Sequence, residues 1–284
     1  MTARLAATAL LLLGGAARAQ SNVTVYGLLD AGVDLTRAGK GSSYRVISGG
    51  DAASRWGIRG AEDLGDGLSA VFKLESAVLL DTGSTAPAFW LRESSVGVSS
   101  SRLGTVTMGR TPTPYWMTSW VLDAFVWGTS GGYPAISRSG ATTQQLLPLL
   151  LNARVDNSLS YVSPGMNGFE FRAQGALGEG SASVGRSFSA ATRYAKGAVD
   201  VALAWQRQNS SNNANGNVQA IALGGSYDLG AAKAYAGYTN EKNSCSTCAG
   251  TLARAAGISG SNASEFTSRC APTALTHSLL SSSC

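Results

Sequence analysis

The chain has 284 residues, of which 35 are glycine, 14% are charged and 44% are hydrophobic, and its formal net charge is +5. Soluble proteins carry about 25% charged residues, so this chain is poor in charge, yet aromatic and branched residues occur along its whole length, which disfavours intrinsic disorder. Glycine has no period of three, which excludes collagen, and one histidine with four cysteines leaves little material for histidine-based catalysis or a disulfide-rich scaffold.

The first twenty residues have the features of an export signal. Arg4 supplies a positive charge, residues 5–13 form a short apolar run, and residues 17–19 are a small-residue cleavage site before Gln20. We therefore expect residues 1–20 to be a cleaved signal peptide, and the alternative is a cytosolic chain with an apolar start. Since no later stretch has 18 apolar residues, the exported product would be periplasmic, secreted, or an outer-membrane β-barrel.

Two-residue alternation begins directly after this signal. Residues 23–35 place small or apolar side chains on one face and polar ones on the other, which predicts a strand longer than the five or six residues usual in soluble proteins. Residues 54–60 alternate again, residues 61–67 are rich in Asp and Gly and predict a turn, and residues 68–78 predict the next strand.

Strands are predicted along most of the remaining chain. In the strands expected at 89–99 and 104–110, the outward row includes Val96, Val98 and Met108, and Arg92 falls on that row, so we expect it at the membrane interface or in a bulge. The strand expected at 154–163 turns Val155, Leu159 and Tyr161 outward. Further strands are expected at 169–177, 187–195, 198–207, 218–227 and 231–239.

Residues 111–152 interrupt this rhythm. They hold four prolines and several aromatic residues, and loops of this length in a compact domain are usually functional or disordered. The aromatic content argues against disorder, so we expect this segment to pack against another part of the molecule.

The pattern as a whole predicts an all-β fold of about eleven strands with no amphipathic helix. Short turns alternate with longer polar loops, as in transmembrane antiparallel β-barrels, and closure into a barrel is required because lipid cannot satisfy an open sheet edge. The alternative is a soluble sandwich with apolar strands.

Four segments carry a family resemblance, namely VTVYGLLDAG, SRWGIRGAEDLGDGLSAVFKLES, GTVTMGRTPTP and VDNSLSYVSP. They resemble the Gram-negative general porins of the Burkholderia, Bordetella and Neisseria type, in order and with the family's spacing over residues 21–266. The resemblance implies a homotrimer of 16-stranded barrels in outer-membrane lipid that passes ions and small polar solutes by diffusion. It also implies that residues 111–152 contain the inward-folded third external loop, the constriction element.

The C-terminal part departs from this family. The residues after the signal suffice for about 10–12 strands rather than sixteen, and residues 267–284 show no alternation and lack a terminal aromatic strand. We hypothesise that the reading frame changes soon after Phe266, which resequencing of the locus would test. A chain that ends as written would have an open edge and would be a truncated porin without a normal pore.

Charged residues of inward parity are the candidate pore lining, because rings of basic side chains favour anions and arginine stays charged with a planar fork that neighbours can hold. Arg110 and Asp123 are candidates by resemblance, Arg110 at the root of the third loop and Asp123 near the family's acidic segment. We hypothesise that Arg59, Arg110 and Arg154 face the loop acid across a constriction, and the alternative is ordinary lumen salt bridges. The full candidate set is Arg55, Arg59, Lys73, Glu75, Arg110, Asp123, Arg154 and Asp156.

Other motifs point to little chemistry. Cys245 and Cys248 have redox spacing without a βαβ unit, so a loop disulfide or idle thiols are expected, and His277 with Cys270 and Cys284 fits no metal site. We expect no cofactor, no metal, no catalytic residues and no nucleic acid partner. The competing functions are a soluble or surface-attached all-β binding protein such as an adhesin, and an enzyme embedded in a barrel.

Overall fold

The structure is a computed structural model that describes residues 22–38, 41–85, 87–122, 151–178, 185–209, 217–243 and 253–260. Twelve of the described strands form one antiparallel sheet, in which β1 pairs with β4 and every later strand pairs with the strand that follows it in the chain. They are β1 (Asn22–Leu28), β4 (Arg55–Gly65), β5 (Leu68–Ala77), β6 (Glu93–Ser100), β7 (Gly104–Pro112), β8 (Arg154–Val162), β9 (Phe169–Ala176), β10 (Ser187–Lys196), β11 (Val199–Asn209), β12 (Asn217–Asp228), β13 (Lys233–Asn243) and β14 (Ala253–Gly260).

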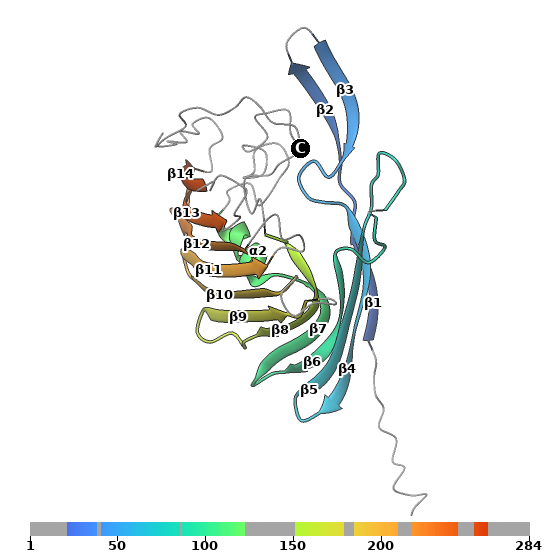
Figure 1. The fold of residues 1–284 in the computed structure, drawn as a ribbon, viewed down its shortest axis with the longest axis vertical. Coiled ribbons are helices and arrows are strands. Elements are labelled where there is room, and N and C mark those ends of the chain that lie inside the picture. Colours follow the sequence, from blue (N-terminus) through green and yellow to red (C-terminus); the bar gives the residue numbers. More distant parts are fainter. Residues whose placement is uncertain are drawn as a thin grey trace, which may run out of the picture.

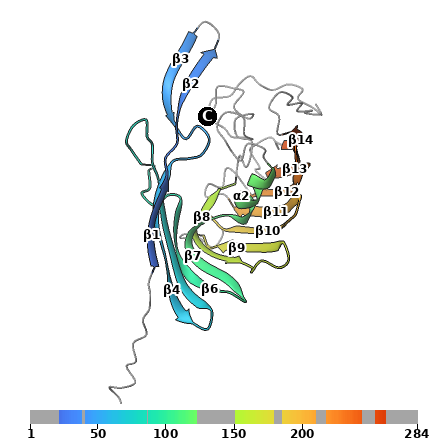
Figure 2. The same ribbon diagram turned by 180° about the vertical axis from the view of Figure 1, so that it is seen from behind.

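The sheet is strongly curved, and its concave side holds a short helix, α2 (Pro114–Ser119), followed by a 3₁₀ turn, η1 (Trp120–Leu122) (Figures 1 and 2). A separate ribbon of β2 (Ala31–Ala38) and β3 (Gly41–Ser48) extends beyond the sheet at the upper end of Figure 1. In the described part of the chain, no helix combines the length and the apolar character needed to cross a bilayer.

The convex face of the sheet carries rows of exposed apolar side chains. Val25 is 70% exposed, Met108 55% and Leu223 54%. The predicted outward positions of Val96, Val98 and Leu159 are confirmed, since all three are exposed. A soluble sandwich would bury such rows between two sheets, whereas a transmembrane barrel presents them to lipid. The arrangement therefore contradicts the sandwich and confirms the all-β transmembrane-type sheet.

The predicted strand at 23–35 is divided in the structure. β1 ends at Leu28 and β2 begins at Ala31, because the backbone of Asp30 pairs with the loop before β4 instead of with a strand. The Asp30 carbonyl accepts hydrogen bonds from Gly49 N (2.8 Å) and Ser54 Oγ (2.8 Å). Its carboxylate Oδ2 accepts from the backbone N–H groups of Asp51 (2.7 Å) and Ala52 (2.6 Å). These N–H groups lower the pKa of the Asp30 carboxyl.

Two other boundaries differ from the prediction. The turn expected at 61–67 is confined to Asp66 and Gly67, both with positive φ (52° and 75°), while β4 continues to Gly65. Positive φ at both central positions is the geometry of the tightest hairpin turns. Neither β3 nor β14 was predicted, so the sequence prediction is incomplete at the first loop and after β13.

Alternation also fails within β8. Val155, predicted to point outward, is only 5% exposed. The pairing of β7 with β8 shifts register between Gly109 and Thr111, and Asn157 on β8 has a φ of 51°. Such a bulge inserts an extra residue into one strand and reverses the faces beyond it. Val155 therefore comes to lie opposite the buried Thr111 instead of in the outward row with Leu159.

A local sequence signal starts helix α2. The Thr113 side chain accepts a hydrogen bond from Trp116 N (3.2 Å), and Pro114 occupies the first helical position. A threonine cap followed by proline is a favoured helix start, so the short helix within the predicted irregular segment has a simple cause.

Small side chains on the inner face of β10–β12 let this helix approach the sheet closely. Tyr115 is 1% exposed and its N–H donates to Ser189 Oγ (3.0 Å). The buried cluster around it consists of Leu122, Leu151, Ala191, Ala204, Val218, Ala220 and Ala222. Packing of the aromatic segment is thus confirmed for residues 113–122. Several predicted features lie outside the described residues, namely the expected signal peptide at 1–20, Asp123, Cys245, Cys248 and residues 267–284.

Candidate functional site

A charged network lies on the concave face of β1, β5 and β6, and Glu75 is at its centre. Glu75 Oε1 accepts from Arg92 Nε (2.7 Å), and Oε2 accepts from the Tyr26 hydroxyl (2.8 Å). Lys73 Nζ lies 2.7 Å from Glu93 Oε2 and 3.5 Å from Glu75 Oε2. The Glu75 side chain is 8% exposed, and a buried carboxylate with three cationic or hydroxyl partners is held in one position.

Strand register explains why Tyr26 reaches Glu75. Both residues lie opposite Gly57, on either side of β4. A Cβ atom at Gly57 would lie 2.8 Å from the Tyr26 hydroxyl oxygen and 2.5 Å from the Leu74 carbonyl oxygen. The glycine therefore leaves the space through which the tyrosine ring crosses to its carboxylate partner.

Two further arginines extend the network. The Arg59 guanidinium lies 5.2 Å from the centre of the Tyr26 ring, a distance that permits a cation–π interaction. Arg154 Nε donates to the Arg92 carbonyl oxygen (2.7 Å), and its guanidinium lies 5.9 Å from the centre of the Trp116 ring on α2. Arg154 thus connects the strand network to the helix inside the curved sheet.

The remaining predicted residues that the structure describes form no ion pair with the members of this network. Arg110 Nη1 forms an ion pair with Asp156 Oδ1 (2.6 Å), and Arg110 Nε donates to the Leu91 carbonyl oxygen (2.6 Å). Leu91 directly precedes Arg92, whose carbonyl oxygen accepts from Arg154, so Arg110 borders the network. Arg55 donates to the nearby Ala53 carbonyl oxygen (3.0 Å).

Sequence reasoning missed Tyr26, Arg92 and Glu93. The expected interface or bulge position for Arg92 is wrong, because β6 begins only at Glu93 and Arg92 lies in the bend before it. There its side chain turns to Glu75. Tyr26 is one of the polar residues of the strand predicted at 23–35, but only the pairing register of β1 with β4 places it beside Glu75.

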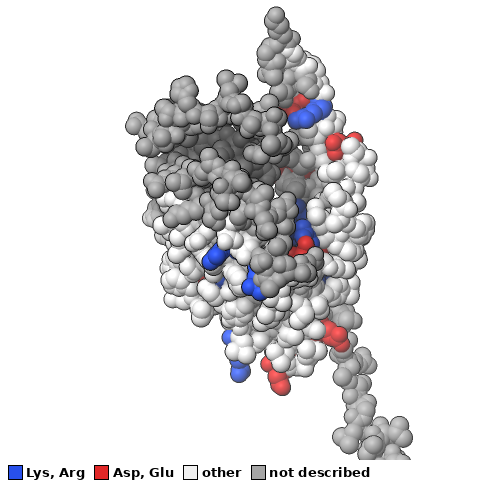
Figure 3. All heavy atoms as spheres, in the orientation of Figure 1, with Lys and Arg blue, Asp and Glu red and all other residues white. Residues whose placement is uncertain are grey.

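The network has more positive than negative charge. Arg59, Lys73, Arg92 and Arg154 face two carboxylates, those of Glu75 and Glu93. In Figure 3, charged side chains gather in the hollow of the molecule and near its turns, while most of the described strand surface in view is uncharged. Among the described residues, no group of His, Cys, Asp and Glu is arranged to hold a metal ion.

Comparisons with known proteins agree on one family. The profile of the family described as Gram-negative porin matches residues 6–263. An outer membrane porin protein of Bordetella pertussis is 33% identical over 260 residues, and outer membrane porin protein 32 of Delftia acidovorans is 34% identical over 248 residues. The matches cover 79% and 82% of this chain, but only 65% and 68% of those two proteins.

A solved structure supports the same assignment. The anion-selective porin from Comamonas acidovorans superposes with a TM-score of 0.71 at 27% identity, over 84% of this chain and 74% of that porin. The apolar convex face, the antiparallel order of strands and the helix inside the curved sheet fit this likeness. The chain therefore belongs to the Gram-negative porin family, and its location is the outer membrane.

Proposed function

We propose that this chain lets ions and small hydrophilic solutes diffuse passively across the outer membrane, with a preference for anions. The observation that carries the proposal is the network on the concave face, in which four cationic side chains face two carboxylates. Fixed positive charge along a water-filled path raises the local concentration of anions. The anion-selective porin from Comamonas acidovorans, to which this structure is similar, supports the direction of the preference.

Each group in the network would have a distinct role. Glu75 and Glu93 hold Lys73 and Arg92 in place, so that these cations form a rigid wall instead of following the passing ion. Arg59 and Arg154, each placed over an aromatic ring, would present their guanidinium groups to solutes. Arg110, paired with Asp156, would add little net field, and Arg55 would belong to the lining nearby.

The family likeness also supports three coarser proposals. The chain assembles as a homotrimer, its convex apolar rows contact outer-membrane lipid, and it acts as a channel without a cofactor and not as an enzyme. Small anions and polar solutes are the species that it passes.

Planar-bilayer recordings of the chain refolded in detergent would test the proposed lining. Arg59→Gln combined with Arg154→Gln should shift the reversal potential in a salt gradient towards weaker anion preference, because two of the four network cations are removed. Arg110→Gln should cause a smaller shift. An unchanged reversal potential in the double variant would refute the assignment.

Arg102→Gln is the matched control, because it removes the same charge from an exposed turn between β6 and β7. Faster gel migration of unheated samples identifies variants that have folded. If no channel of any selectivity is formed by the folded wild-type chain, the proposed function is wrong.

A further inference from the structure

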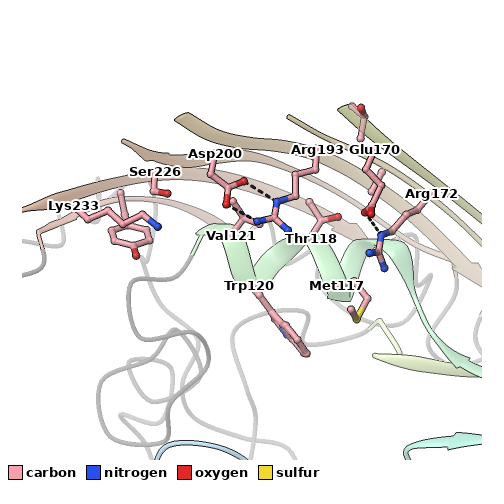
Figure 4. Close-up of a pocket in the computed structure, with 13 residues that line it drawn as sticks. Met117, Thr118, Trp120, Val121, Glu170, Arg172, Arg193, Asp200, Ser226 and Lys233 are labelled. Carbon is pink, nitrogen blue, oxygen red and sulfur yellow. Dashed lines mark hydrogen bonds and ion pairs between the residues drawn. The ribbon is translucent and has the colours of Figure 1, made fainter. Parts of the chain in front are cut away.

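A second polar site lies inside the curved sheet, on strands that the network around Glu75 does not use. A cavity of about 380 Å³ lies beside α2 and η1 and is lined by residues of these two elements and of β9–β13 (Figure 4). It shares no lining residue with that network. Its volume lies within the range of small-molecule sites, roughly 300–1,000 Å³.

The strand wall of the cavity carries two arginines held by carboxylates. Arg193 donates from Nε to Asp200 Oδ1 (2.8 Å) and from Nη2 to Asp200 Oδ2 (2.6 Å). Arg172 donates from Nε to Glu170 Oε1 (2.6 Å). A guanidinium has five N–H donors, so these bonds use two of the donors of Arg193 and one of those of Arg172. The pairs orient both guanidinium groups from the sheet towards the helix (Figure 4).

The charge of the lining is positive. Lys233 on β13 also lines the cavity, so three cations face two carboxylates. Arginine that is already positioned by a carboxylate loses little side-chain entropy when it binds a second anion. The strand wall is therefore suited to an anionic group, and in particular to a planar carboxylate that matches the guanidinium fork.

The opposite wall is different in character. Met117, Trp120 and Val121, from α2 and η1, line the helix side of the cavity, so part of this wall is apolar. Thioether and indole groups make favourable contacts with flat, polarizable ligands. A ligand that satisfies both walls has a carboxylate at one end and an apolar, preferably aromatic, body at the other.

We propose that this cavity is a docking site for small amphipathic carboxylates, with Arg172 and Arg193 binding the carboxylate and Met117 and Trp120 contacting the apolar body. The inference rests on the proposed pore function, since the cavity lies on the concave side of the sheet. It goes beyond a general preference for anions, because it requires saturable binding that depends on the body of the solute as well as on its charge.

Ligand-detected NMR on the full chain refolded in detergent tests the proposal with benzoate as the probe. Benzoate should bind saturably, while acetate, which lacks the ring, and benzyl alcohol, which lacks the charge, should each bind at least about tenfold more weakly, equivalent to the loss of one charge-assisted contact or of the ring burial. Equal binding of acetate and benzoate, or no saturable benzoate signal, would overturn the proposal.

The decisive variant removes both ion pairs together, as Glu170→Gln, Arg172→Gln, Arg193→Gln and Asp200→Asn. It leaves no carboxylate without its partner and keeps the net charge of the lining. Benzoate binding should weaken by about tenfold or more, and the reversal potential should stay as in the wild type, because the network around Glu75 is intact. Unchanged benzoate binding would show that the arginines do not form the site.

Two further variants keep the test informative if the fourfold variant does not fold. Met117→Ala should weaken binding of benzoate several-fold but leave the weak binding of acetate unchanged, and equal losses for both would contradict the apolar contact. Arg102→Gln should leave benzoate binding unchanged. Failure of the pore alone would appear as absent conductance with normal benzoate binding, and failure of this site as normal conductance without binding.

Discussion

The hydroxyl of Tyr26 donates a hydrogen bond to the Glu75 carboxylate across β4, the strand that lies between their two strands. Glu75 already has Arg92 as a partner at 2.7 Å, so the tyrosine does not neutralise its charge. Instead it fixes the second carboxylate oxygen and prevents rotation of the group. In a lining that selects by charge, such positional control determines where the field acts.

Tyr26→Phe isolates this hydroxyl. We expect the variant to lose roughly 1 kcal/mol of stability, the usual net value of one hydrogen bond, and to show noisier open-channel current because Glu75 is held at one oxygen. Denaturant unfolding followed by gel mobility measures the first effect, and bilayer recording the second. Tyr44→Phe, on the exposed ribbon strand β3, is the control. Identical behaviour of the two variants would contradict the positioning role.

At the scale of elements, single residues join neighbouring segments by hydrogen bonds. Asp30 is such a point, since its carbonyl and carboxylate together bind the loop that leads from the ribbon into β4. Because the lowered pKa of Asp30 belongs to the folded state, its carboxylate stabilises the fold above the unfolded pKa, about 3.9, and that stabilisation is lost as the pH falls through the lower folded value.

Asp30→Asn should therefore be less stable than the wild type at neutral pH. The gap between the two denaturation midpoints should begin to narrow below about pH 4 and should close as the pH falls through the lower folded pKa of Asp30, because the carboxylate in the folded wild type is protonated only there. Unfolding curves recorded at a series of pH values measure the gap. A gap that stays constant down to the lowest pH would show that charge at Asp30 does not hold the junction.

A pair of glycines allows the 3₁₀ turn η1 to pack closely against the sheet. Gly224 on β12 and Gly237 on β13 are direct partners, and a Cβ atom at Gly224 would lie 2.6 Å from Leu122 Cδ2 and 2.6 Å from Gly237 Cα. The 3₁₀ turn η1 therefore packs directly against the backbone of these strands. A larger side chain at Gly224 would prevent this close contact.

Gly224→Ala should lift η1 from the sheet and narrow the path inside it. We expect a stability loss of about 1–3 kcal/mol, typical of overpacking, and a lower single-channel conductance. Gly175→Ala is the matched strand glycine, because its Cβ would meet only ordinary contacts at 3.7 Å with Phe188. Wild-type conductance in folded Gly224→Ala protein would show that the glycine pair does not determine the position of η1.

Most strands could be predicted because the repeating outward apolar rows are a local signal. The bulge at Asn157 could not, since it depends on how β8 registers against β7. The bend at Arg92 and the contact between Tyr26 and Glu75 likewise depend on pairing between strands distant in sequence. Residues 253–260 consist mostly of small side chains, so alternation there is too weak to predict β14. The sequence therefore predicts which charged residues face inward, but the contacts that join them into a network can be seen only in the structure.

At the scale of the whole molecule, polar contacts are concentrated where a soluble protein keeps its dry core. Thr111, Ser158 and Gln174 form buried hydrogen bonds across β7, β8 and β9, while valine, leucine and phenylalanine cover the outside. The charged networks on the concave side therefore lie beside a buried polar layer that is hydrogen-bonded across three strands.

The exposed apolar rows also constrain when this sheet can be completed. In water they would attract each other or the rows of another copy, so early folding in the aqueous compartment would lead to aggregation. We therefore expect the polypeptide to stay unfolded in water and to complete the sheet only on contact with hydrocarbon.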